Sequence, residues 1–153
     1  MKDNAFYLLV AADIDKSRIS APSAREVARL CFAKNAWGIG VRTQYRTSLK
    51  LGDRVVVYIA GVRECRQSFV AKATIASSVE VTPMAIGHRV WPFTVRLADY
   101  QWLEEPVPIK PLLSRFSFIS NPKAKKWGSR LQGGIVRITK SDFNLVTGSK
   151  RLT

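Results

Sequence analysis

The segment from Trp37 to Gly61 constrains the fold of this chain more than any other. It opens with Trp-Gly-Ile-Gly, crosses a polar stretch, and reaches the run Arg54–Ala60 through a Gly52-Asp53 turn. That run is rich in β-branched residues and nearly continuously apolar, so it predicts a strand buried on both faces. The two glycines after Trp37 leave its indole beside bare backbone, in a loop at the rim of the sheet, where a planar ligand can approach closely.

Hydrophobic patterning predicts a strand over Phe6–Ala12, and the capping box Ser23–Glu26 predicts a helix over Ala24–Ala33. Pro92 predicts an edge position or a bulge in its strand, because proline cannot donate to the ladder. We further expect a short helix or turn over 43–49, strands over 68–77, 88–98 and 134–139, a loop over 82–87, and short helices beginning near Ile109 and Thr139. These elements predict an α+β fold: a curved, mostly antiparallel β-barrel flanked by short helices.

With 153 residues, 46% of them hydrophobic, the chain is expected to form one globular domain over residues 1–153. The polar stretch Ser149–Thr153 is either a frayed tail or the start of a linker to another domain. No apolar run approaches the roughly 20 residues that span a bilayer, so we expect a cytoplasmic protein. Cys31 falls on an apolar helix face and Cys65 in a polar loop, which favours free thiols over a disulfide.

Charge is the strongest compositional clue to function. Lysine and arginine number 25, aspartate and glutamate 11, and the formal net charge is +14. Beyond Lys110, Asp142 is the only acidic residue. Such a field attracts polyanions and makes their binding salt-dependent, so we expect a nucleic-acid partner. Charge-based solubility and membrane-surface binding are the alternatives, but no basic amphipathic helix or lipidation motif supports a membrane partner.

The residues that most enzyme classes require are missing from the sequence. The single histidine, His88, has no partners at metal-ligand spacing, so we expect no metal and no cofactor. Phosphate-binding glycine loops, nucleophile elbows and deaminase motifs are also missing. Glu104 and Glu105 are the acidic pair available to a magnesium-dependent nuclease, but neighbours on an extended segment point to opposite faces. We therefore expect no catalytic residues.

Four tryptophans, at positions 37, 91, 102 and 127, exceed what a core of this size needs. Indoles can sandwich a nucleobase, and each stacked base contributes about 1–3 kcal/mol. A single tryptophan more often belongs to a core or its rim. Trp37 and Trp127 are the stronger candidates for base binding, because each precedes a glycine in a polar segment with basic residues nearby. For Trp91 both interpretations stay open, and Trp102 is expected to pack.

A series of motifs from about Phe6 to Val146 resembles the EVE domain family, a relative of YTH and other PUA-like modules. The N-terminal motifs are Trp37-Gly-Ile-Gly-Val-Arg42, Leu51-Gly-Asp-Arg-Val-Val-Val-Tyr58 and Phe69–Ile75. The C-terminal set is the most specific: Pro108–Leu113, Phe116–Ile119, Asn121, Lys126-Trp-Gly128, Gln132-Gly-Gly134 and Asp142-Phe143.

The resemblance implies a PUA-like barrel with an aromatic pocket that accepts a flipped, modified base. It makes Trp37 one wall of the pocket and places the backbone of Gly38 and Ile39 at the base edge. The other base-binding residues that we expect are Asn35, Tyr58, Trp91 as the second wall, Phe118 and Trp127. For phosphate binding we expect Arg42, Arg46, Lys123, Lys125, Lys126 and Arg130.

We therefore predict a non-catalytic reader of modified bases, with 5-methylcytosine or 5-hydroxymethylcytosine in DNA as the ligand. Three alternatives remain open at this stage. The first alternative is an RNA-binding module of the same fold. The second is the specificity domain of a modification-dependent restriction endonuclease, and the third is a nuclease that uses Glu104 and Glu105. The second alternative implies an effector nuclease domain or subunit as a partner.

Overall fold

The computed structural model describes residues 4–148 except 16, 19, 62, 129, 130, 132 and 133. In chain order its elements are β1 (Phe6–Ala11), α1 (Ala24–Ala33), β2 (Ala36–Ile39), β3 (Arg54–Ile59), β4 (Ser68–Ile75), β5 (Met84–Ile86), β6 (Arg89–Trp91), β7 (Phe93–Pro108), the 3-10 helix η1 (Lys110–Arg115), β8 (Ile135–Ile138) and α2 (Lys140–Thr147). The predicted strands at 6–12, 54–60, 68–77 and 134–139 and the helix over 24–33 are thereby confirmed. Among the described residues, no helix is both long and apolar enough to cross a bilayer.

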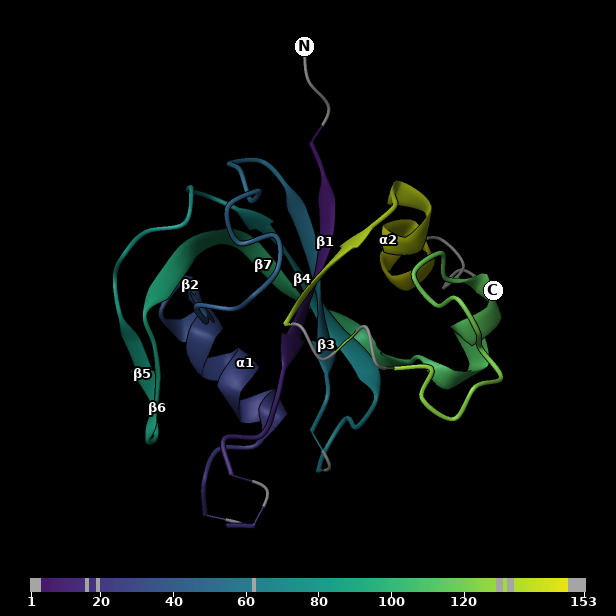
Figure 1. Ribbon diagram of the computed structural model, residues 1–153, viewed down its shortest axis with the longest axis horizontal. Helices are drawn as coiled ribbons and strands as arrows, with labels where there is room; N and C mark the ends of the chain where they lie inside the picture. Colours follow the sequence, from purple (N-terminus) through teal and green to yellow (C-terminus); the bar gives the residue numbers. More distant parts are fainter. Residues whose placement is uncertain are drawn as a thin grey trace.

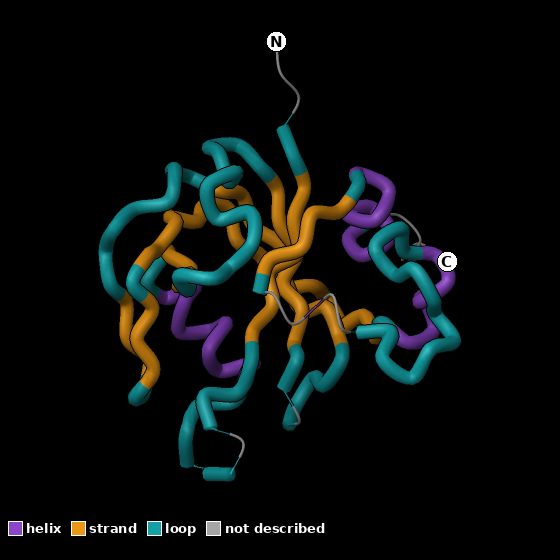
Figure 2. The backbone as a smooth tube through the Cα atoms, viewed as in Figure 1, coloured by secondary structure: helices purple, strands orange, loops and turns teal. Residues whose placement is uncertain are grey.

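Six strands form one curled sheet in the order β2-β7-β4-β3-β1-β8, and β5 pairs with β6 in a separate ribbon. The pairing is antiparallel throughout the six-stranded sheet except between β1 and β3, which run parallel with Phe6 opposite Arg54. Figure 1 shows α1 and α2 on opposite sides of the central strands β1, β3 and β4, and Figure 2 shows the same central strands between the two helices. The predicted curved, mostly antiparallel sheet with flanking short helices is confirmed as a half-barrel.

Two hydrophobic cores lie on the two faces of the sheet. Successive side chains of a strand point to opposite faces, and on β3 Val55 and Val57 face the core that contains α1, whereas Val56 and Tyr58 face the core that contains α2. Burial of β3 on both faces therefore confirms what its apolar run predicted.

A β-bulge in β4 decides what packs against Tyr58. Val57 pairs with Ala71 but Tyr58 pairs with Phe69, so Val70 is the extra residue. The shift turns Phe69 to the face of the α2 core, where its ring lies 5.3 Å from that of Tyr58 and 5.5 Å from that of Phe116. Bulges re-aim side chains in this way, and no residue pattern in β4 predicted it.

Capping side chains fix both helix starts. The Ser23 hydroxyl accepts from the Glu26 N–H (3.3 Å), and the Asp13 carboxylate accepts from the Ala24 N–H (2.7 Å). Glu26 does not complete the predicted capping box, because its carboxylate pairs with Arg29 instead. At α2, Thr139 and Asp142 form a complete capping box, which confirms the predicted start of that helix.

Three predictions near the sheet edge were wrong. Residues 84–86 form β5 within the predicted loop, and the predicted strand 88–98 is divided at Pro92 into β6 and β7, the second of which continues to Pro108. Without an N–H, Pro92 cannot extend the ladder, and the chain changes there from pairing with β5 to pairing with β2. Trp37, expected in a loop, lies in β2 opposite Val95, because the turn after α1 ends at Asn35.

Asp53 ties the turn before β3 to the start of β1. Asp53 is 3% exposed, and its carboxylate accepts from the N–H groups of Ala5 and Lys50, both at 2.9 Å. Asp53→Ala leaves these donors without their charged acceptor, so we expect the free energy of unfolding to fall by about 2–4 kcal/mol. Urea denaturation measures this loss, with the exposed Glu105→Ala as control; equal stability of the two variants would contradict the assignment.

Candidate functional site

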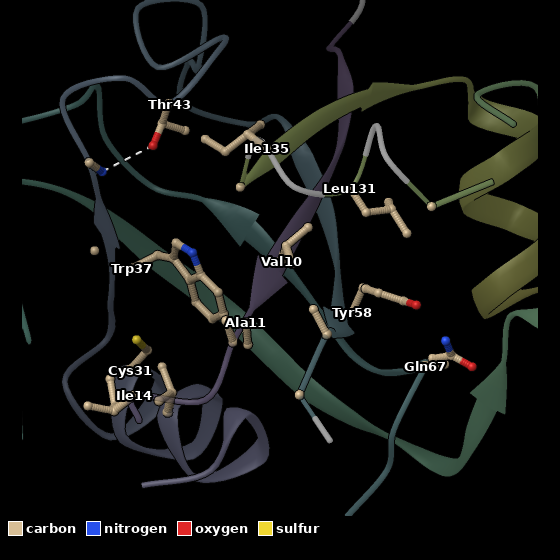
Figure 3. Close-up of a pocket in the computed structure, with 18 of the residues that line it drawn as sticks. Val10, Ala11, Ile14, Cys31, Trp37, Thr43, Tyr58, Gln67, Leu131 and Ile135 are labelled. Carbon is tan, nitrogen blue, oxygen red and sulfur yellow. Dashed lines mark hydrogen bonds between the residues drawn. The ribbon is translucent and has the colours of Figure 1, made fainter. Parts of the chain in front are cut away.

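A pocket of about 980 Å³ opens where β1 and β3 end. Because the two strands are parallel, their carboxyl ends meet at one edge of the sheet, where they contribute Ala11, Ala12, Tyr58 and Ala60 to the lining. Residues from α1, β2, β6, β8, the loops after β1, β2 and β3, and the segment before β8 complete the pocket. The lining draws on both cores, with Trp37 and Cys31 from the α1 side and Tyr58 and Leu131 from the α2 side (Figure 3).

Trp37 projects from β2 into the pocket, and both its indole and Ala11 of β1 belong to the lining (Figure 3). The side chain is only 4% exposed and packs in the α1 core, where its ring centroid is 6.5 Å from that of Phe32. The turn after β2 is held by Thr43, whose hydroxyl oxygen accepts from the Gly40 N–H (3.1 Å). Trp37 is thus both a core residue and part of the pocket wall.

Gly38 is where the indole of Trp91 lies against bare backbone. A Cβ on Gly38 would lie 2.6–2.8 Å from three atoms of that ring, closer than packing allows. The guanidinium of Arg89 also lies over the Trp91 ring, at 4.9 Å from its centroid. All three residues line the pocket. The glycine after Trp37 therefore makes room for a second tryptophan.

Two ionisable groups in the pocket are held neutral at physiological pH. Burial raises the pKa of the Tyr58 phenol to about 12, against a smaller opposing effect of Arg66. Burial likewise raises the pKa of the Cys31 thiol to about 12, although a hydrogen bond from the Gly38 backbone favours the thiolate. A phenol and a thiol in these states offer polar hydrogens and no negative charge.

The charged side chains of the lining are all basic. Arg66, Arg89, Lys125 and Lys126 line the pocket, and no described lining residue is acidic. Charges of one sign around a concave, low-dielectric site focus the field and concentrate counter-ions there. The pocket therefore combines indoles, which suit a planar ring, with cations, which suit an anion.

The structure brings together about half of the residues predicted from sequence. Those that line the pocket are Trp37, Gly38, Tyr58, Trp91, Lys125, Lys126 and Trp127. Among residues that do not, Ile39 is buried in the α1 core, and Phe118 is buried in the α2 core, where its ring lies 5.0 Å from that of Phe116. Asn35 is exposed, and its backbone carbonyl oxygen accepts from the Leu97 N–H.

The predicted phosphate contacts divide in the same way. Arg46 lies over the Phe93 ring (4.7 Å) and donates to the Val41 carbonyl, outside the pocket. Arg42 and Lys123 are exposed and are not part of the lining. Arg130 lies outside the described residues, as does the predicted Gln132-Gly133 motif.

Sequence reasoning missed Cys31, Arg66 and Arg89 as pocket residues. For two of them the sequence held information that could have identified them. Arg66 belongs to the loop that follows the strand of Tyr58. Arg89 is two positions before Trp91 and is therefore on the same face of its strand. Cys31 was interpreted as a buried small hydrophobe, which it is, at 1% exposure. Nothing in the pattern of α1 shows that the pocket reaches it.

The curled, mostly antiparallel half-barrel flanked by short helices has the PUA-like fold that the sequence predicted. The family model of the EVE domain matches residues 20–148, and the chain belongs to that family. The UPF0310 protein PYRAB08750 of Pyrococcus abyssi is 30% identical over 74% of this chain and 84% of its own length. The UPF0310 protein msl3206 of Mesorhizobium japonicum is 35% identical over 64% of this chain and 66% of its own length.

Solved structures with the same fold include nucleic-acid complexes. Human THYN1 in complex with DNA containing 5-methylcytosine has a TM-score of 0.59 at 14% identity, covering 94% of this chain and 96% of that one. The YTH domain-containing protein mmi1, in complex with RNA, has a TM-score of 0.54 at 8% identity, with 93% and 82% covered. The N-terminal domain of Staphylothermus marinus McrB has a TM-score of 0.50 at 11% identity, with 95% and 94% covered. At these identities the likeness establishes the fold alone.

The contact between Gly38 and Trp91 gives a direct test of the pocket wall. In Gly38→Ala the new methyl group overlaps the indole, so we expect Trp91 to shift and stability to fall by about 1–3 kcal/mol. The indole N–H signals in NMR spectra and urea denaturation measure the two effects. Gly40→Ala is the matched control, since its nearest neighbour would be Thr43 Oγ1 at 3.4 Å; an equal response from both variants would contradict the packing.

The two thiols should react at very different rates. Cys31 is 1% exposed with a pKa raised by burial, whereas Cys65 is half-buried in the loop after β3. Because the thiolate is the reactive form, we expect iodoacetamide at pH 8 to alkylate Cys31 at least about tenfold more slowly than Cys65. Peptide mass spectrometry at timed intervals measures both rates, and comparable rates would show that Cys31 is accessible.

Proposed function

We propose that this protein is a non-catalytic reader of modified nucleic acid that takes a base, 5-methylcytosine or 5-hydroxymethylcytosine in DNA, out of the stack and into the pocket. The observation that carries the proposal is the convergence of Trp37, Trp91 and Trp127 on one pocket whose charged lining is entirely basic. The indoles provide surfaces for a planar base, and the cations bind the backbone phosphates that flank it.

The energetics of this arrangement are consistent with base extrusion. Unstacking a base costs a few kcal/mol, and one stacking contact returns about 1–3 kcal/mol. Aromatic contacts alone therefore roughly balance the cost. Phosphate contacts from the basic residues supply the remaining affinity, which makes binding dependent on salt, while contacts to the modified group supply preference.

Relatives of the same fold support nucleic acid as the ligand. THYN1 was solved with DNA containing 5-methylcytosine, the modified base proposed here. Mmi1 was solved with RNA, which supports the second candidate, an RNA-binding module that uses the same pocket. One binding array of unmodified, methylated and hydroxymethylated DNA and RNA at two salt concentrations separates the two candidates.

The likeness to the McrB N-terminal domain supports a further arrangement, in which this domain provides specificity to a nuclease. The effector would be a separate subunit or a further domain. Purification of the tagged full-length protein from its native host, followed by assay for modification-dependent cleavage, tests this arrangement. Co-purifying cleavage that vanishes with Trp37 variants would support it, and DNA binding without such cleavage would favour a reader that acts alone.

A nuclease that uses Glu104 and Glu105 has less support. Both residues are exposed on β7, and neither lines the pocket. Within the described part of the chain, no group of three or more His, Cys, Asp or Glu residues is arranged to hold a metal ion. Magnesium-dependent cleavage by the purified protein, lost in Glu104→Gln, would reverse this judgement.

The role of Trp37 is best tested with phenylalanine, because alanine at this buried site would cost about 3–5 kcal/mol of stability. We expect Trp37→Phe to lower the preference for methylated over unmodified DNA by about tenfold, since the smaller ring loses contact with the modified group of the base. Fluorescence anisotropy with paired oligonucleotides measures the preference, and salt-dependent background binding should persist.

Trp102→Phe provides the matched control for this substitution. Trp102 packs edge-on against Phe32 (5.2 Å) and beneath Arg25 (5.1 Å), and it is not part of the pocket lining. This variant should keep the preference of the wild type. An unchanged preference in Trp37→Phe, with folding intact, would contradict the proposed function.

A further inference from the structure

Arg89 is held in place at the pocket by an aromatic ring rather than by an acid. Its guanidinium lies over the Trp91 indole at 4.9 Å, and that indole in turn lies against the Gly38 backbone. Arg89 and Trp91 are two positions apart on β6, so their side chains leave the strand on the same face. The guanidinium is therefore positioned by a packed support that reaches back to β2.

This support leaves the hydrogen-bonding capacity of the guanidinium unused. Stacking occupies the flat face of the group, whereas its N–H donors lie in the plane and remain available for a bidentate acceptor. Among the described residues, ion pairs join Glu26 to Arg29 and Glu80 to Arg96, and neither of these pairs involves Arg89. No described residue of the pocket lining is acidic.

We propose that Arg89, supported by Trp91 and Gly38, is a binding site for a pair of anionic oxygens on the ligand of the pocket. Those oxygens belong either to a phosphate that flanks the bound nucleotide or to a carboxylate on its base. The inference rests on the proposed function for the identity of the ligand. It changes the role of Trp91, which serves as the support for the arginine instead of the wall opposite Trp37.

The first test compares Arg89→Ala with Arg25→Ala. The two substitutions remove the same charge, and in both cases the guanidinium lies over an indole, but Arg25 lies over Trp102 and is not part of the pocket lining. We expect Arg89→Ala to weaken oligonucleotide binding about tenfold and to reduce the slope of log K against log salt by about one. We expect Arg25→Ala to do neither, and equal effects of the two variants would overturn the proposal.

A second pair of variants tests the support. Arg89→Lys keeps the charge but loses the planar fork, so it should retain the salt slope and still lose affinity. Gly38→Ala displaces Trp91 and should reproduce the loss seen in Arg89→Ala without adding to it. The proposal would be overturned if Arg89→Lys bound with the affinity of the wild type and if the losses in the Gly38→Ala, Arg89→Ala double variant were additive. Those results would show that only the net charge at position 89 contributes to binding.

Modified oligonucleotides distinguish the two sources of the anion. If Arg89 binds a phosphate, replacing the phosphate beside the modified base with one methylphosphonate lowers the affinity of the wild type for the oligonucleotide but not that of Arg89→Ala. If the ligand is a carboxylate, 5-carboxylcytosine binds the wild type more tightly than 5-methylcytosine does, and Arg89→Ala removes that advantage. Either pattern supports the site, and the absence of both overturns it.

A mononucleotide titration separates failure of this site from failure of the proposed function. Deoxycytidine monophosphate should shift the Arg89 Nε–H signal in NMR spectra of the whole protein, whereas deoxycytidine, 5-methyldeoxycytidine and inorganic sulfate at equal ionic strength serve as references. A shift with the monophosphate, but no preference for modified DNA, would retain the anion site and reject the reader function. If the monophosphate causes no shift and Arg89→Ala keeps the preference for modified DNA, the anion site is rejected and the reader function is retained.

Discussion

The parallel pairing of β1 with β3 is the constraint on which the rest of the site depends. It brings the carboxyl ends of two central strands to one edge of the sheet, where Ala11 of β1 lies opposite Ile59 of β3 and each strand continues into a loop. Because β3 is buried on both faces, each hydrophobic core reaches that edge. The pocket therefore forms between two rigid cores, and its walls are core residues rather than loop side chains alone.

This origin explains the combination of burial and charge at the site. Tyr58 and Cys31 are buried enough for their pKa values to rise to about 12, so neither supplies a negative charge to offset the basic residues around them. Arg89, which lies over Trp91, remains without an acidic partner in the described lining. Because the charged residues of the described lining are all basic, the site favours an anion, and its indoles favour a planar ring.

Local patterning predicted most of the secondary structure, because capping boxes, apolar runs and a Gly-Asp turn act over a few residues. The helix over 24–33 and the strand β3 follow from such signals. The division at Pro92 and the length of β7 do not, since they depend on which strand each segment finds as a partner. The bulge at Val70 has the same origin: it suits the packing of Phe69 beneath Tyr58, a contact between strands.

For the site, the residue types could be identified from the sequence: indoles followed by glycines, an excess of cations, and few acids with which to neutralise them. Which of these residues meet depends on how the strands pair and curl. Trp37 and Tyr58 lie on strands separated by two others in the sheet, and the curl of the half-barrel brings both to one pocket. The same curvature left Ile39 in the α1 core and brought Arg89 to the pocket, because sheet closure depends on long-range pairing that no local pattern encodes.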